Sequence, residues 1–182
     1  QILNNHASIL QERGDFESAK QLYRKVLEQD PNHPNARSNL GCLEQQNGDL
    51  DQARDLYQAH LTRYPNDTRI WVNFAGVLLS QNKWDQGWDA YQHRLDDPKP
   101  IMEVPPNLGL WQNTQEPLRR LVVVHEQGLG DSFQFSRFLS SLPTQVRHVV
   151  FSGPSKLHGL LKHSGLIETC WDPEDPHFQW KD

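Results

Sequence analysis

The chain repeats itself with a period of 34 residues, and this periodicity constrains its fold more than any other feature. In the first two copies a glycine, an alanine, a tyrosine and a proline recur in the same order: Gly14, Ala19, Tyr23 and Pro31, then Gly48, Ala53, Tyr57 and Pro65. A third copy keeps only the tyrosine in kind: Asn82, Gly87, Tyr91 and Lys99. A fixed period of this length is typical of arrays in which each repeat is one supersecondary unit stacked on its neighbours.

The pattern resembles the tetratricopeptide repeat, a helix-turn-helix unit of that length, over roughly residues 2–97. Small residues at equivalent positions of the two helices allow close helix packing: Ala7, Gly41 and Ala75 in the first helix, and Ala19, Ala53 and Gly87 in the second. The tyrosine is expected to fill the space between successive hairpins. About three repeats are present, which is the usual minimum for a stable array.

Turn and breaker residues set the expected helix ends. Gly14 and Gly48 lie where a helix stops and the backbone needs a positive φ. Pro31 and Pro65 end the second helix of each repeat, because a proline disfavours helical geometry in the residue before it. The sequence therefore predicts an α-helical array with helices at 2–13, 16–29, 36–47, 50–63, 69–81 and 85–95.

Stacked hairpins form a concave surface that can hold a peptide or another domain. Asn5, Asn39 and Asn73 recur at the 34-residue offset on the predicted first helices. Side-chain amides donate and accept together, so they can bind a peptide backbone without reading its sequence. These asparagines predict a repeat groove with a protein or peptide partner. The alternatives are solvated polar residues on a pure scaffold.

Composition excludes several classes of protein. The net charge of -5 argues against nucleic acid as a partner. No apolar run approaches the roughly 18 residues of a transmembrane segment, and no signal peptide opens the chain. Cys42 and Cys170 cannot form a disulfide framework or a metal site by themselves. We expect a cytoplasmic protein without a metal, and the first residue, Gln1, indicates an internal cut.

Residues 98–118 are expected to connect the array to a second domain. Residues 96–118 contain five prolines, a density that breaks regular structure: Pro98, Pro100, Pro105, Pro106 and Pro117. Leu110 and Trp111 are the expected anchors of this connector.

From residue 119 to 182 the pattern changes to alternating strands and helices. Short apolar runs at 121–124, 146–151 and 166–171 predict strands, and helices are predicted at 132–142 and 154–163. This order indicates a parallel, Rossmann-like α/β sheet. Because a complete doubly wound domain has more strands, residues 119–182 are expected to be the N-terminal part of a truncated domain.

The loop after the first of these strands carries the chemical signal. Gly128 and Gly130 lie at the carboxyl end of the strand, where open α/β sheets bind ligands, and they are expected to supply backbone freedom and close approach. The third glycine of a dinucleotide fingerprint is absent, since Phe133 stands there, and no Gly-Lys-Ser of a P-loop follows.

Residues 121–138, with Trp111 before them, resemble the start of a bacterial glycosyltransferase domain attached to tetratricopeptide repeats. That domain is similar to the lipopolysaccharide heptosyltransferases, which have the two-domain GT-B fold and invert the anomeric centre. The stretch with Gly87, Trp88, Tyr91 and Arg94 resembles the last repeat of those proteins. Ser132 and Phe138 depart from the commoner Thr and Tyr.

The resemblance implies that Asp131 is the catalytic base for an acceptor hydroxyl. The alternative is that Asp131 only caps a helix beginning at Ser132. Further ligand-binding residues would line the same cleft: Glu126, Gln127, Gly128, Gly130, Gln134 and Arg137. The resemblance also implies a nucleotide-sugar donor, a sugar acceptor and no metal.

Two functions follow from the sequence. The first is a fragment of a repeat-bearing glycosyltransferase, whose repeats bind a protein or carrier and whose α/β part binds the acceptor. This chain alone would be inactive, because the second Rossmann domain that holds the donor is absent. The alternative is a non-catalytic repeat module for protein interaction.

Overall fold

The computed structural model describes residues 2–96, 109, 111, 117–167 and 169–172. It divides into two compact units, residues 1–100 and 101–182, which are described separately. Most of the expected connector, including Leu110, lies outside the described residues, whereas the described Trp111 is half-buried. No helix among the described residues combines the length and apolar character needed to span a bilayer.

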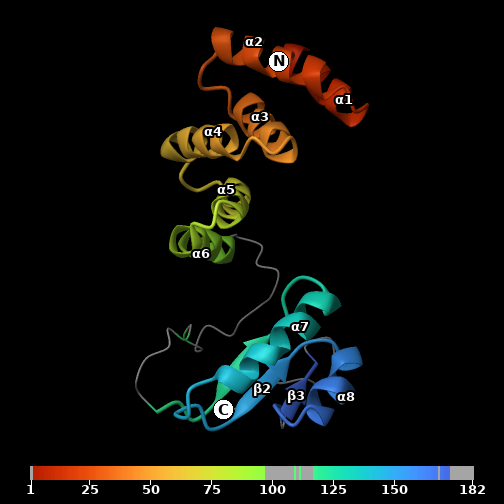
Figure 1. Ribbon diagram of the computed structural model, residues 1–182, viewed down its shortest axis with the longest axis vertical. Coiled ribbons are helices and arrows are strands. Elements are labelled where there is room, and N and C mark those ends of the chain that lie inside the picture. The colour runs from red at the N-terminus through yellow and green to blue at the C-terminus, as the bar shows by residue number, and fades with distance from the viewer. Residues whose placement is uncertain (1, 97–108, 110, 112–116, 168, 173–182) are drawn as a thin grey trace. The chain divides into compact units, whose positions relative to one another are not determined.

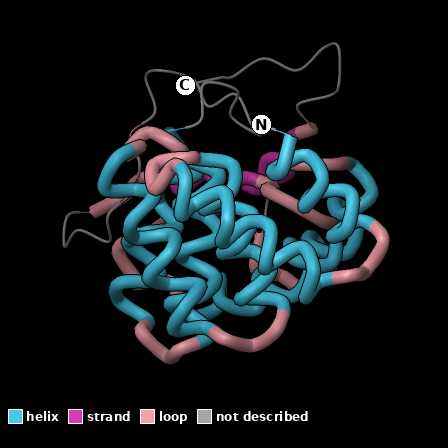
Figure 2. Tube along the Cα trace, turned by 90° about the horizontal axis from the view of Figure 1, so that it is seen from above, coloured by secondary structure: helices cyan, strands magenta, loops and turns pink. Residues whose placement is uncertain are grey.

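The first unit is a stack of three helical hairpins (Figure 1). Its helices are α1 (Ile2–Glu12), α2 (Phe16–Gln29), α3 (Pro34–Gln46), α4 (Leu50–Arg63), α5 (Thr68–Ser80) and α6 (Trp84–Gln92). Figure 2 looks down this stack, so that the successive hairpins overlie one another. The sequence predicted each helix to within two residues, except that α6 gives way after Gln92 to the 3₁₀ turn His93–Asp96.

The turns inside the hairpins confirm the reading of the glycines. Gly14 and Gly48 both have φ of 83°, and Asn82 takes the same left-handed conformation in the third repeat with φ of 59°. Asp15 and Asp49 then cap the next helix by accepting a backbone N–H, worth about 1 kcal/mol each. Lys83 occupies the equivalent position before α6 and provides no such cap.

Small residues bring the helices into close contact, as predicted. A Cβ on Gly41 would lie 2.6 Å from the ring of Tyr57, which is completely buried. A Cβ on Gly87 would lie 2.7 Å from the side chain of Leu79. One core cluster joins α1, α2 and α3 and a second joins α4, α5 and α6, so the core follows the stack instead of forming one thick centre.

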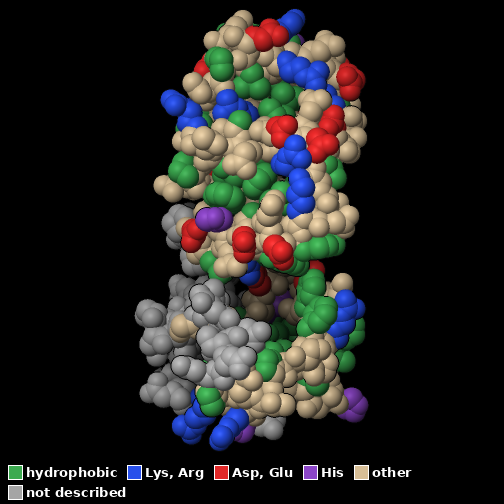
Figure 3. Space-filling model, turned by 60° about the vertical axis from the view of Figure 1, so that its left-hand side comes forward, with side chains coloured by type: hydrophobic (Ala, Val, Ile, Leu, Met, Phe, Trp, Pro, Cys, Tyr) green, Lys and Arg blue, Asp and Glu red, His purple; other side chains and the backbone are tan. Residues whose placement is uncertain are grey.

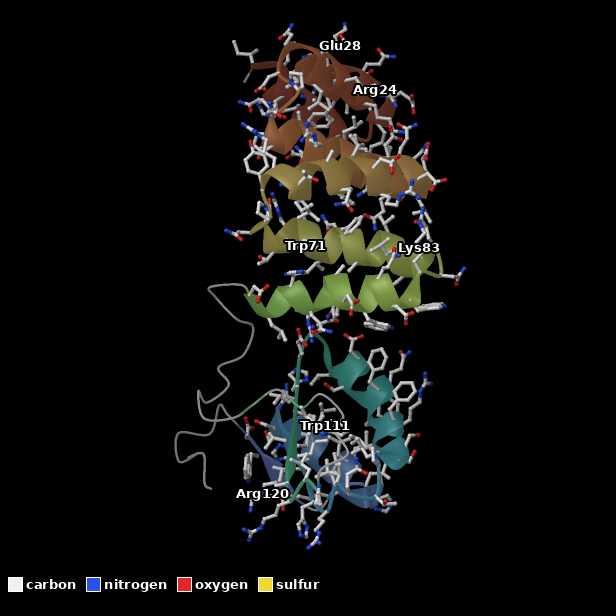
Figure 4. The ribbon with its side chains drawn as sticks, turned by 90° about the vertical axis from the view of Figure 1, so that its left-hand side faces the viewer. Arg24, Glu28, Trp71, Lys83, Trp111 and Arg120 are labelled. Atoms are coloured by element: carbon white, nitrogen blue, oxygen red, sulfur yellow. The ribbon has the colours of Figure 1, made fainter. Side chains whose placement is uncertain are left out.

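The third hairpin is closed at one end by aromatic contacts. The Trp71 ring stacks on His93 with centroids 4.1 Å apart, and its Nε1 donates to the Pro65 carbonyl at 2.8 Å. Figure 4 shows Trp71 and Lys83 at opposite ends of this hairpin. The stacking holds the end of α6 and the 3₁₀ turn against the start of α5.

A buried ion pair joins the first repeat to the second. Lys20 Nζ on α2 lies 2.7 Å from Glu44 Oε2 on α3, with the two side chains 5% and 2% exposed. Arg24, labelled in Figure 4, is half exposed and lies 2.8 Å from the other carboxylate oxygen of Glu44. At the next interface the equivalent positions hold Arg54, which pairs with Asp51 and Asp55, and the buried Leu78.

The second unit contains a three-stranded parallel sheet in the order β1-β2-β3, which confirms the α/β prediction. Its elements are β1 (Leu121–Val124), α7 (Leu129–Ser136), the 3₁₀ turn Arg137–Ser141, β2 (Val149–Ser152), α8 (Ser155–His163) and β3 (Thr169–Trp171). Val123, Phe151 and Cys170 are register partners on the face that packs against α8. Burial raises the pKa of the Cys170 thiol.

Three details of this unit differ from the sequence prediction. The helix after β1 begins at Leu129 instead of 132, and its last part is a 3₁₀ turn. β2 and β3 are each three residues shorter at their starts, because Val146 makes only an isolated bridge with Leu118. Phe133, Phe135 and Phe138 are more than half exposed. They point to different sides of a short helix, of which no residue is buried.

Candidate functional site

A chain of hydrogen bonds crosses the interface between the first two repeats. The Tyr23 hydroxyl on α2 donates to Gln11 Oε1 at 3.0 Å and lies 3.1 Å from Ser8 Oγ, both on α1. Asn39 on α3 donates its Nδ2 hydrogen to the same hydroxyl at 3.1 Å. The buried tyrosine therefore ties the first helices of two successive repeats together through one oxygen atom.

The same arrangement recurs one repeat later. The Tyr57 hydroxyl donates to Gln45 Oε1 at 3.1 Å and lies 3.2 Å from Cys42 Sγ. Asn73 Nδ2 approaches the same sulfur at 3.6 Å. Burial, and then the hydrogen bond to Cys42, raise the pKa of Tyr57, so the hydroxyl stays protonated and able to donate.

The network ends at the third repeat because its polar partners are replaced. Gly76 and Leu79 stand 34 residues after Cys42 and Gln45 and offer no side-chain acceptor to Tyr91. Arg94 instead lies over the Tyr91 ring, 4.3 Å from its centroid. The polar floor of the array is therefore built by the first two repeats.

An open pocket of about 460 Å³ lies beside this polar floor. It is lined by residues of α1, the start of α2, and α3: Ser8, Gln11, Glu12, Phe16, Asn39 and Gln46. The lining combines three side-chain amides, a hydroxyl, one carboxylate and one half-exposed phenyl ring. Such a surface offers hydrogen-bond donors and acceptors together with an apolar contact.

The three predicted groove asparagines have different environments. Asn39 lines the pocket, and Nδ2 is the one atom of its side chain that bonds to another described residue. Asn5 is exposed on α1, and Asn73 is half-buried on α5 outside the pocket. Sequence reasoning missed Gln11 and Gln46. The recurrence of Gln11 as Gln45 at the 34-residue offset was the available signal for the first of these.

The pocket carries no cation from its helices. α1 contains no Lys or Arg, and the one Arg of α3, Arg37, donates to the carbonyls of Ala59 and Pro31. Glu12 is the charged lining residue. Over the array in Figure 3, side chains of both charge signs are interspersed with apolar ones.

The second candidate site, at the carboxyl end of β1, differs from its prediction in the backbone. Gln127 takes the left-handed conformation with φ of 67°, whereas neither Gly128 nor Gly130 has a positive φ. The expectation that these two glycines supply left-handed freedom is therefore wrong, because the turn falls one residue earlier. A Cβ on Gly130 would meet nothing within 4 Å.

Asp131 lies in the first turn of α7. Its Oδ2 accepts the backbone N–H of Gly128 at 3.0 Å, so the carboxylate reaches back to cap the helix from inside it. The predicted cap of a helix beginning at 132 is corrected to this geometry, because α7 starts three residues earlier. His125 Nδ1 lies 2.6 Å from Ser132 Oγ and holds the same loop against the end of β1.

The other predicted ligand residues lie around this loop without enclosing a cavity. Glu126 is half-buried at the end of β1, and Gln134 is exposed one turn beyond Asp131 on α7. Arg137 is also exposed and lies over the Phe138 ring. Their roles in ligand binding and the role of Asp131 in catalysis stay predictions.

The one further cavity found in this unit lies on another part of the sheet. It has a volume of about 230 Å³ and is lined at the starts of the strands and on one face: Arg119, Arg120, His148, Val149, Val150, Thr169 and Trp171. Among the described residues, no cluster of three His, Cys, Asp or Glu side chains has the arrangement to hold a metal ion.

Comparison with known proteins identifies the class of the first unit. A family model described as tetratricopeptide repeat matches residues 10–71. The first unit is therefore a tetratricopeptide-repeat array, and it is followed by a small parallel α/β unit that this family model does not reach. No curated protein sequence matches the chain.

Solved structures show the same fold. MamA from Desulfovibrio magneticus RS-1 is 25% identical with a TM-score of 0.50, over 53% of this chain and 55% of that one. The first repeat domain of Spaghetti (RPAP3), bound to an HSP90 peptide, is 15% identical with a TM-score of 0.51, over 53% and 78%. The Yersinia enterocolitica chaperone SycD is 19% identical with a TM-score of 0.51, over 54% and 69%. The chain spans about half the length of MamA.

Proposed function

We propose that the repeat array is a protein-interaction module that binds an extended peptide through its main chain, in the pocket between α1 and α3. The observation that carries the proposal is the anchoring of Asn39. Its Nδ2 donates to the buried Tyr23 hydroxyl, so the amide is held in one orientation beside the pocket. A side chain fixed before binding loses less conformational entropy when a ligand arrives.

The chemistry of the lining favours a peptide backbone as the ligand. Each peptide unit presents one N–H and one carbonyl, and the amides of Asn39, Gln11 and Gln46 can complement both. Phe16 offers an apolar contact for one side chain of the peptide. Recognition of this kind tolerates many sequences, because main-chain groups are the same in nearly every residue.

The charge of the pocket disfavours acidic ligands. RPAP3 was solved with the HSP90 peptide SRMEEVD, which carries several carboxylates. Carboxylates are recognised most strongly by Arg or Lys, and α1 offers neither, whereas Glu12 would repel them. We therefore expect a neutral or basic peptide in this pocket.

Fluorescence polarisation with a library of end-blocked heptapeptides tests the proposal. Peptides without Asp or Glu should bind better than those containing them, and N-methylation of alternate backbone amides should abolish binding. Asn39→Ala and Gln46→Ala should each weaken binding roughly 2- to 12-fold, the range for one hydrogen bond of about 0.5–1.5 kcal/mol. Asn66→Ala, in the exposed loop between α4 and α5, is the matched control and should have no effect.

Two outcomes would contradict this function. If side-chain substitutions in the peptide abolish binding while N-methylation leaves it intact, the pocket reads sequence and not the backbone. If Asn39→Ala and Asn66→Ala bind the library equally well, the anchored amide has no part in recognition.

The glycosyl-transfer hypothesis is a second candidate for a longer protein that contains this chain. The observation that favours it is the position of Asp131 and Gln134 beside the carboxyl end of β1 in a parallel sheet, where such sheets bind ligands. Asp131→Asn in the longer protein should lower sugar transfer by about two or more orders of magnitude while the protein folds normally. Unchanged transfer in that variant would leave Asp131 as a helix cap alone.

A further inference from the structure

The first helix of the array presents a face that is covered wherever it recurs in the later repeats. The 34-residue offset aligns Ile2 and Ile9 of α1 with buried residues of α3 and α5, which are at most 1% exposed: Ala36 and Leu43, then Ile70 and Val77. α3 packs these residues on α2, and α5 packs them on α4. Ile2 is 85% exposed and Ile9 is 47% exposed, since no described helix precedes α1.

The last helix of the array presents the opposite face in the same unpartnered state. Trp88 and the nearby Leu95 align with residues that contact the next repeat: Lys20 and Leu27 near α3, then Arg54 and Leu61 beside α5. Trp88 is 52% exposed and Leu95 is 47% exposed. Trp84, one turn before Trp88 on α6, is 55% exposed. These three residues form an apolar end face.

We propose that the two end faces bind each other between copies of this chain, so that α6 of one copy packs on α1 of the next. The contact would continue across molecules the interface that α2 makes with α3 and α4 makes with α5 inside one molecule. The partner is a second copy, because this chain itself carries both halves of the repeating interface.

The residues at the centre of the proposed contact are compatible. Inside the array the central pair is Lys20 with Glu44 at the first interface, where the two charges neutralise each other. At the proposed interface the equivalent pair is Trp88 of one copy and Leu10 of the next, which are both apolar. No charge would be buried without a partner at this position, which would otherwise oppose association.

The proposed contact joins two different faces, and this determines the kind of assembly. A head-to-tail interface does not close into a symmetric dimer but adds copies at both ends, giving open chains. The pocket beside Asn39 belongs to α1 and α3 and is not part of either end face. Association and peptide binding can therefore be tested separately.

Sedimentation velocity from micromolar to near-millimolar concentration tests the proposal on the 182-residue chain. The unmodified chain should form larger species as its concentration rises. Trp88→Glu and Ile9→Glu should each weaken association at least roughly 30-fold, as expected for residues at the centre of an interface. Leu160→Glu on α8, where Leu160 is 50% exposed, is the matched control and should associate normally. Far-UV circular dichroism should show all variants folded, because each replaced side chain is about half exposed in the monomer.

Mixing the two variants tests the head-to-tail geometry itself. Trp88→Glu keeps an intact α1 face, and Ile9→Glu keeps an intact α6 face, so an equimolar mixture should form a one-to-one pair and nothing larger. Symmetric pairing through either face would instead leave one of the two variants associated on its own.

Three results would overturn the inference. The first is an unmodified chain that stays monomeric over the whole concentration range, in which case another part of the protein or a different partner covers the faces. The second is a folded Trp88→Glu or Ile9→Glu variant that associates as well as Leu160→Glu. The third is a mixture of the two variants that stays monomeric.

Discussion

Breaking the buried Lys20–Glu44 pair should destabilise the array far more than its position at one helix interface suggests. Both side chains are almost completely buried, and their charged atoms lie 2.7 Å apart. Glu44→Leu would remove the carboxylate and leave the Lys20 ammonium without its buried partner. Loss of one member of a buried pair costs about 3–5 kcal/mol, and we expect the lower part of this range because a long Lys side chain can turn its ammonium towards water.

Replacing both members together should recover most of the loss. In Lys20→Met/Glu44→Leu no charge remains to be desolvated, and Leu fits because Leu78 occupies the equivalent position at the next interface, where it is 3% exposed. We expect the double variant to lie within about 1 kcal/mol of the unmodified chain or to exceed it. Arg54→Met, at the surface position equivalent to Lys20, is the control and should have little effect.

Urea unfolding followed by far-UV circular dichroism measures these differences, because the array contains most of the helix in the chain. For a slope of about 2 kcal/mol per molar urea, Glu44→Leu should lower the midpoint by roughly 1.5–2 M. A single variant as stable as the unmodified chain would mean that Lys20 reaches water without cost. A double variant as unstable as the single one would mean that shape, not charge, sets this interface.

Three further predictions concern single positions. Gly48→Ala should cost about 1–2 kcal/mol in urea unfolding because φ is 83°, and Gly48→Asn should cost less, since Asn82 already holds this conformation; equal losses would contradict the backbone explanation. Burial raises the pKa of Tyr57 above its unfolded value, so its contribution to stability should be complete below about pH 10 and decline at higher pH, and Tyr57→Phe should show a smaller decline in unfolding free energy. Asp131→Ala should destabilise the α/β unit by about 0.5–2 kcal/mol in thermal unfolding, and an unchanged melting curve would show that its bond to the Gly128 N–H carries no weight.

The sequence by itself determined the repeat architecture. Period, small residues and turn glycines act locally or between adjacent helices, so the positions of Gly14, Ala19 and Tyr23 were enough to place each helix to within a few residues. The alternation of strands and helices after residue 119 likewise predicted a parallel sheet. These features could be predicted because each depends on a few neighbours in the chain.

The tertiary structure decided what depends on residues far apart in the chain. Glu44 reads as an ordinary surface residue of a helix until α2 places Lys20 against it, across 24 positions. The anchoring of Asn39 by the Tyr23 hydroxyl appears only when three helices meet. The turn before α7 shifted the left-handed residue from the glycines to Gln127, because hydrogen bonding by Asp131 fixed where that helix begins. Distances between side chains are set by packing, and packing is a property of the whole array and not of any one segment.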